Sequence, residues 1–183
     1  MTGHEQNEYK ALRETIRERG TARVCIFVAG ISIWAATTIA TAALAATPVA
    51  TLLPLLVLAS AFEGVFALHV GVERVGRYIQ VFYEPDEAAA APGGAGRWEH
   101  TAMAFGRPAG APTTDALFTV PFLLAGLCNA APVMLLHPVR EELLFVGGAH
   151  ALFVLRIVVA RLSAGRQRAI DLQRFTQLRE SRR

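Results

Sequence analysis

VATLLPLLVLASAFEGVFALHVGV, residues 49–72, is the stretch of sequence that decides the fold. A hydrocarbon core of about 30 Å requires about 20 apolar residues at a helical rise of about 1.5 Å per residue. This run has that length and contains one acidic residue, Glu63. It continues without a helix breaker into ERVGRYIQVFYE, residues 73–84. We therefore expect one long helix that crosses a bilayer and extends beyond it.

Three further runs are long and apolar enough to cross a bilayer, at residues 24–46, 116–136 and 143–162. Apolar residues make up 53% of the 183-residue chain, which is a high share for a soluble domain, and they are gathered in these blocks. The sequence therefore predicts an all-α fold in which residues 24–162 form a four-helix transmembrane bundle.

Amphipathic cytoplasmic helices are predicted at both ends of this bundle. In residues 1–23 an apolar stripe recurs at helical spacing, and we expect Gly20 to separate this helix from the first span. Its members are Tyr9, Leu12 and Ile16. Residues 163–183 predict a basic helix with three apolar side chains that face lipid or the amino-terminal helix. They are Ile170, Phe175 and Leu178.

Basic residues are distributed unevenly among the segments outside the spans. Five precede the first span, four lie in the loop 73–115 and seven lie from residue 161 onward, whereas the two remaining connections hold only Arg140. Because basic residues accumulate on the cytoplasmic side of a membrane, we expect both termini and the loop 73–115 to be cytoplasmic. Attraction to anionic lipid accounts for the net charge of +3 without a nucleic-acid partner.

Two charged residues are expected inside the bilayer at similar depth. Glu63 lies about 22 Å and Arg156 about 20 Å from the outer ends of their helices at the usual rise per residue. A lone charge at mid-span costs at least about 2.5–3.5 kcal/mol, so we expect the two to neutralise one another, with the Glu63 carboxylate directed into the bundle. The pair is either a structural clamp, which we favour, or a gate or ion-coupling site.

A second polar layer is expected nearer the outer surface. The depths of Asn129 and His150 match those of Thr37 and Thr38 in the first span, so hydrogen bonds between helices are predicted there. For His150 a structural role is favoured over a proton relay.

Small residues recur along the second span at spacings of four, three and four. They are Ser60, Gly64, Ala67 and Gly71. At about 100° per residue they fall on one stripe, which is typical of membrane helices that approach one another closely. We interpret this stripe as a helix-packing seam.

The sequence lacks the motifs of the common enzyme and cofactor sites. It has no glycine-rich phosphate loop, nucleophile elbow or HExxH motif, so we expect no enzymatic activity and no cofactor. His69 with Glu73, and His137 with Glu141 and Glu142, offer too few ligands for a typical metal site. We therefore assign no metal.

Two segments of the sequence are similar to segments of other proteins. They are EYKALRETI, residues 8–16, and RVGRYIQVFYE, residues 74–84, with the later Trp98 and Glu99. These resemble a loose group of uncharacterised small bacterial integral membrane proteins with an ALRxEI-like opening helix and an RIGxYI-like segment after the second span. The resemblance implies a location in the bacterial inner membrane and no particular activity.

Two functions remain open at this stage. The first is a membrane scaffold or sensor that engages an unidentified protein partner through its cytoplasmic helices. The second is an oligomeric ion channel or small transporter that uses the Glu63 and Arg156 layer. A single bundle of this size has little room for a pore, so the second function requires a homo-oligomer.

Overall fold

The computed structural model describes residues 2–44, 47–84, 98–99, 114–136 and 138–182. In these ranges there are four long helices and one 3₁₀ turn. The helices are α1 (Gly3–Leu44), α2 (Leu52–Phe82), α4 (Thr114–Leu135) and α5 (Arg140–Glu180), and the turn η1 (Pro48–Thr51) precedes α2. No strand occurs in the described ranges. The prediction of an all-α fold with four helices is confirmed.

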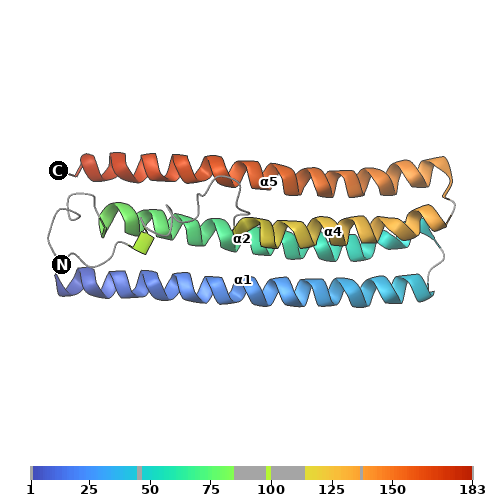
Figure 1. The fold of residues 1–183 in the computed structure, drawn as a ribbon, viewed down its shortest axis with the longest axis horizontal. Coiled ribbons are helices and arrows are strands. Elements are labelled where there is room, and N and C mark those ends of the chain that lie inside the picture. Colours follow the sequence, from blue (N-terminus) through green and yellow to red (C-terminus); the bar gives the residue numbers. More distant parts are fainter. Residues whose placement is uncertain (1, 45–46, 85–97, 100–113, 137, 183) are drawn as a thin grey trace.

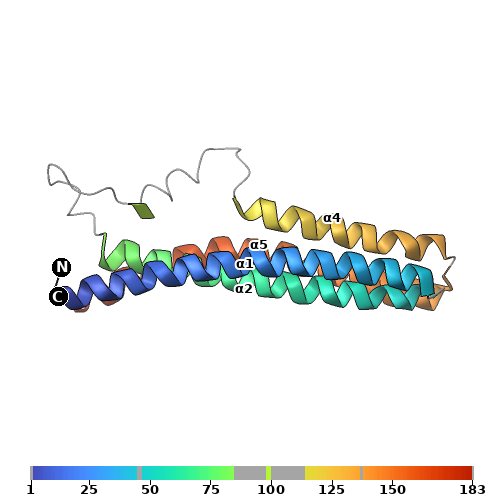
Figure 2. The same cartoon turned by 90° about the horizontal axis from the view of Figure 1, so that it is seen from below.

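The helices run along one common direction, and the two ends of the chain lie at the same end of the bundle (Figure 1). α2 packs against α1, α4 and α5 and has the most extensive contacts in the bundle. α4 lies on one side of the layer formed by the other three (Figure 2). Within the described residues, no Cα atom of α1 comes within 8 Å of one in α5. α1 and α5 are therefore connected through α2 and α4, each of which packs against both.

Three helical segments are long and apolar enough to cross a membrane: α1, η1 with α2, and α5. In α4 the apolar part that the structure describes, Thr119–Leu135, is shorter. α4 nevertheless occupies the position predicted for the third span, residues 116–136.

α1 differs from the prediction at Gly20. The predicted break between an amphipathic helix and the first span does not occur, since one helix of 42 residues runs from Gly3 to Leu44. A glycine inside a helix costs only about 1 kcal/mol relative to alanine, which is too little to interrupt a helix that is favourable on both sides. The predicted amphipathic segment, residues 1–23, and the first span therefore belong to one continuous helix.

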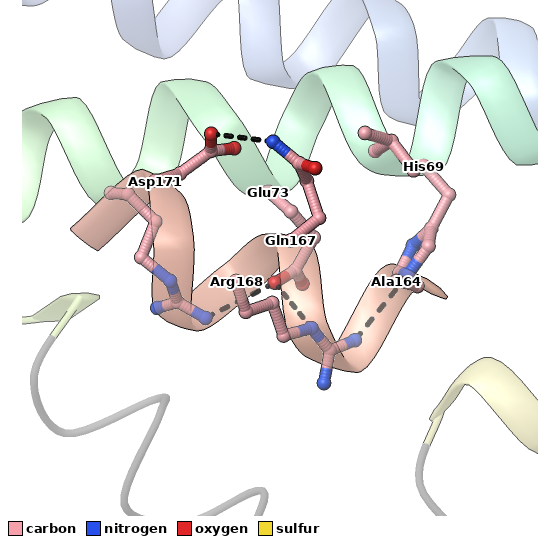
Figure 3. Close-up of a pocket in the computed structure, with 8 residues that line it drawn as sticks. His69, Glu73, Ala164, Gln167, Arg168 and Asp171 are labelled. Atoms are coloured by element: carbon pink, nitrogen blue, oxygen red, sulfur yellow. Dashed lines mark hydrogen bonds and ion pairs between the residues drawn. The ribbon is translucent and has the colours of Figure 1, made fainter. Parts of the chain in front are cut away.

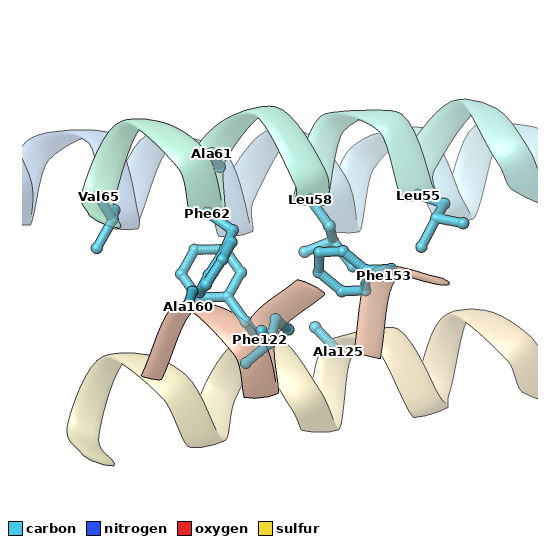
Figure 4. Packing of buried hydrophobic residues seen from close by; sticks show 10 residues of the cluster. Leu55, Leu58, Ala61, Phe62, Val65, Phe122, Ala125, Phe153 and Ala160 are labelled. Carbon is cyan, nitrogen blue, oxygen red and sulfur yellow. The ribbon is translucent and has the colours of Figure 1, made fainter. Parts of the chain in front are cut away.

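Aromatic and aliphatic side chains of three helices form the core (Figure 4). Phe62 of α2 packs edge to face against Phe122 of α4 and Phe153 of α5, with ring centroids 5.4 and 6.3 Å away. Leu58 and Ile157 are fully buried beside them. Such aromatic pairs contribute about 0.5–1.5 kcal/mol beyond the area that they bury, so this cluster fixes how α2, α4 and α5 face one another.

Candidate functional site

Glu63 and Arg156 meet, as their depths predict. Nη2 of Arg156 donates to Oε2 of Glu63 at 2.7 Å, which joins α2 to α5. The guanidinium also lies 5.3 Å from the ring centroid of Phe66. The expectation that the carboxylate points into the bundle is wrong, because the side chains of Glu63 and Arg156 are 48% and 42% exposed. The pair therefore lies on the outer surface of the helix bundle.

Asn129 is the centre of a buried hydrogen-bond network. Its Nδ2 donates to the carbonyl oxygen of Thr51 at 2.9 Å and lies 3.0 Å from Nε2 of His150, while its Oδ1 accepts from Trp34 Nε1 at 3.2 Å. Nδ1 of His150 is 2.8 Å from the carbonyl oxygen of Val146. A carbonyl only accepts and an amide nitrogen only donates, so His150 carries its proton on Nδ1. The network joins α1, η1, α4 and α5.

The two threonines predicted for this layer do not join the network. The hydroxyl of Thr37 donates to the carbonyls of Ile33 and Trp34, and that of Thr38 donates to Trp34. Such bonds within one helix satisfy the hydroxyl without linking helices. Trp34, which the sequence analysis did not assign to the layer, supplies the contact from α1 instead. Its depth was the available signal, because it lies mid-span and outside an aromatic belt.

Two residues of the small-residue seam face α1, and the other two are exposed. A Cβ on Gly64 would lie 3.3 Å from Ile26, and one on Gly71 would lie 2.8 Å from Arg19, so both glycines face α1. Ser60 and Ala67 are exposed. Among the described glycines, the tightest contact between α1 and α2 is at Gly30, where a Cβ would lie 2.3 Å from that of Ala61. The stripe thus lies on the edge between the α1 contact and an open face of α2.

A polar network joins α2 and α5 where the apolar segments end, on the side of the bundle that carries both chain termini (Figure 3). Glu73 pairs with buried Arg77 at 3.2 Å and with Arg168 of α5 at 3.0 Å. Asp171, also buried, pairs with Arg74 at 3.2 Å and accepts from Gln167 at 2.8 Å. Asp171 was not predicted, because nothing in the sequence shows which charge of the basic tail turns inward.

His69 lies beside this network and between two arginines. Its Nδ1 is 3.0 Å from Arg23 Nη1 and its Nε2 is 3.4 Å from Arg168 Nη2. Arginine only donates hydrogen bonds and an imidazole accepts at no more than one ring nitrogen, so only one of these two contacts can be a hydrogen bond to His69. Both ring nitrogens face arginines, and Glu73 is paired with arginines, so His69 and Glu73 lack the arrangement of a metal site. No group of three or more potential metal ligands occurs in the ranges that the structure describes. His137 lies outside these ranges.

An aromatic cluster holds the helices together at the end that carries both termini. The Tyr78 ring lies 5.6 Å from that of Phe175 and 6.1 Å from that of Tyr83, which in turn lies 5.5 Å from Tyr9. The expectation that Phe175 faces lipid or the amino-terminal helix is wrong, since it packs against α2. Burial raises the pKa of the Tyr78 and Tyr83 hydroxyls, with a further contribution from Glu8. Both hydroxyls therefore remain protonated at neutral pH.

Glu99 binds to this same end of the bundle. Its carboxylate accepts from Arg13 of α1 at 2.5 Å, and its backbone N–H donates to Glu84 at 3.0 Å. A Cβ on Gly76 would lie 3.0 Å from Glu99 Oε2, so the glycine allows the carboxylate to approach α2. Burial raises the pKa of Glu99, and the positive charge of Arg13 opposes this shift only in part.

No match to this chain is found among protein-family models, curated proteins or solved structures. The class of protein is therefore inferred from the described residues themselves. They form an all-α membrane protein by the length and composition of its helices.

Proposed function

We propose that this chain is a four-span protein of the bacterial inner membrane that acts as a scaffold or sensor through its helical extensions. Three candidate spans and the apolar segment Thr119–Leu135 support the number of crossings. The basic flanks support cytoplasmic termini. The position of both chain ends at the same end of the bundle is consistent with an even number of crossings (Figure 1).

The observation that carries this proposal is the continuity of three helices beyond the apolar segments. α1 has 42 residues and is about 63 Å long, roughly twice the thickness of a hydrocarbon core. Outside the spans, α1, α2 and α5 are joined by the ring contacts of Tyr78 and by the ion pairs of Arg13 and Arg74. A shift or rotation of the spans would therefore displace the extensions as a unit, which is the property that a sensor requires.

The α5 extension offers a surface for a partner. Basic and apolar side chains of this helix are exposed side by side: Arg166, Ile170, Arg174 and Leu178. Arginine beside apolar area is favourable for recognition of an acidic surface by charge and contact together. We propose that the partner is a protein with an acidic, partly apolar helix face.

Photo-crosslinking in intact cells tests this function. A photoreactive residue at Ile170 should give a discrete protein adduct, and one at Ala151, which is exposed within the span on the side of α5 away from Arg156, should not. Arg166→Glu with Arg174→Glu should abolish the Ile170 adduct without changing the amount of protein in the membrane. The proposal is wrong if the Ile170 adduct survives these charge reversals, or if Ile170, like Ala151, gives only lipid adducts.

A channel or small transporter is the second candidate. Because Glu63 and Arg156 lie on the outer surface, assembled copies could bring several such pairs together. Ion flux into vesicles containing the purified protein separates the candidates. A flux that Glu63→Gln abolishes would support the channel, whereas equal leak for wild type, Glu63→Gln and empty vesicles supports the scaffold.

A further inference from the structure

The ion pair of Glu63 and Arg156 lies on an open face of α2. The exposed side chains of this face recur at spacings of three and four residues: Leu53, Leu56, Ser60, Glu63 and Ala67. They lie opposite the core positions Leu58, Phe62 and Val65, so none of the other three helices covers them. This face is separate from the α5 extension considered above, and the inference does not depend on the proposed function.

Lipid is a poor covering for this face. Both charges lie within the apolar length of their helices, where exposure to hydrocarbon is costly and charged residues almost always face protein or water. Their mutual pairing removes part of that cost. It leaves further hydrogen-bonding capacity on each partner, since a carboxylate accepts several hydrogen bonds and a guanidinium donates five.

A second copy of the same chain can supply further hydrogen-bond partners for Glu63 and Arg156, because it carries the same carboxylate and guanidinium. A two-fold axis along the bilayer normal places the same surface of two copies together. Glu63 of one copy then meets Arg156 of the partner, and the two positive and two negative charges alternate in one layer. Ser60 and Ala67 flank Glu63, and small residues there allow two α2 helices to approach closely. The three-four spacing is that of helices that pack at about 20°.

We propose that the protein forms a parallel homodimer through the open face of α2, with Glu63 and Arg156 of both copies in one four-charge layer. The intrachain pair fixes the two side chains before the copies meet. The same pair then supplies the charge complementarity that selects a second copy over lipid.

Energy transfer between labelled copies in lipid vesicles tests this dimer. Ala67→Phe should weaken association at least about tenfold, whereas Ala151→Phe should leave it unchanged. Ala151 is the matched control because it is exposed on the far side of α5. The proposal fails if the wild type remains monomeric at every protein-to-lipid ratio, or if both substitutions have the same effect.

Mixed charge variants test the reciprocal pairing and do not require bulky substitutions. Glu63→Gln copies carry two uncompensated arginines when they pair with themselves, and Arg156→Gln copies carry two uncompensated glutamates. A mixed pair retains Arg156 on one copy and Glu63 on the other. We expect mixed dimers to exceed either homodimer severalfold. Equal association of all three combinations would show that the two copies meet through another face.

Disulfide trapping gives a third readout if Ala67→Phe does not fold. The free cysteines Cys25 and Cys128 are first replaced by alanine. Ser60→Cys should then form a disulfide between copies on mild oxidation, and Ala151→Cys should not. Crosslinking at both positions, or at Ala151→Cys alone, contradicts the proposed face.

Discussion

Gly30 of α1 lies directly against Ala61 of α2, so closely that a Cβ on Gly30 would be 2.3 Å from that of Ala61. Gly30 is also the buried residue of α1. Real Cβ atoms do not approach to this distance, so any side chain at position 30 must push the two helices apart. The contact is the closest that the described glycines make with a neighbouring helix.

Gly30→Ala should therefore destabilise the protein by about 1–3 kcal/mol, as overpacking of a tight core does. Reversible unfolding in mixed micelles would measure the change. Gly147→Ala is the matched control, because nothing lies within 4 Å of a Cβ at Gly147. That substitution should be neutral or stabilising through helix propensity. If Gly30→Ala behaves like Gly147→Ala, then α1 and α2 do not pack at this distance.

Asn129→Leu should destabilise the protein by about 1–3 kcal/mol, because buried polar groups lose their partners. The half-buried Trp34 N–H and the buried Thr51 carbonyl would both face an apolar side chain in place of the amide. The same unfolding measurement applies, and Trp34 fluorescence should shift as well. Thr37→Val serves as the control and should change stability by less than about 0.5 kcal/mol, since that hydroxyl contacts only its own helix. Equal costs for both variants would argue against a network centred on Asn129.

Glu63→Gln and Arg156→Gln should show energetic coupling. In a double-mutant cycle on monomeric protein in detergent, each single change leaves one charge without its partner, and the double change removes both. We expect a coupling free energy of about 0.5–3 kcal/mol. Additive single effects would mean that the 2.7 Å contact does not contribute to stability.

The association of Glu99 with the bundle should weaken as pH rises. The pKa of Glu99 is raised above its ordinary value of 4.5 mainly by burial, so the bound state holds its proton at pH values where the released state has lost it. A group that binds more protons in the folded state stabilises less as pH increases. The contribution is therefore complete below about pH 4.5 and decreases as pH rises through the raised pKa.

Fluorescence of Trp98, the neighbour of Glu99, would follow this transition in a Trp34→Phe background. Glu99→Gln should remove the pH dependence in the acid range, because the amide does not titrate. Glu14→Gln is the control, since Glu14 pairs only with nearby Arg17 on the surface of α1. A pH profile that Glu99→Gln leaves unchanged would assign the titration to another group.

The sequence predicted the features that depend on distance along a helix. The run 49–72 is apolar over the thickness of a bilayer, and depth alone brought Glu63 and Arg156 to one level. The sequence did not predict the features that depend on rotation about the helix axis. Glu63 faces outward because Leu58 and Phe62, on the opposite side of α2, fill the core.

The partners of small and polar residues were also beyond prediction. The stripe of Ser60, Gly64, Ala67 and Gly71 indicates that another helix packs closely against α2. The spacing of these residues does not show which helix it is. Similarly, Asn129 was assigned to a polar layer, yet the choice of Trp34 over Thr37 follows from the relative rotation of α1 and α4. The partner of each residue is determined by how whole helices pack and not by the local spacing of residues in the sequence.

The central position of α2 has a consequence for biosynthesis. α1 and α2 are adjacent in sequence and share the tight contact at Gly30, so this hairpin can assemble once residue 84 has left the ribosome. α4 and α5 emerge later and pack on faces of α2 that α1 leaves free. No segment has to be inserted between helices that are already in place. The order in which the chain is made is thus the order in which it can be built into the membrane.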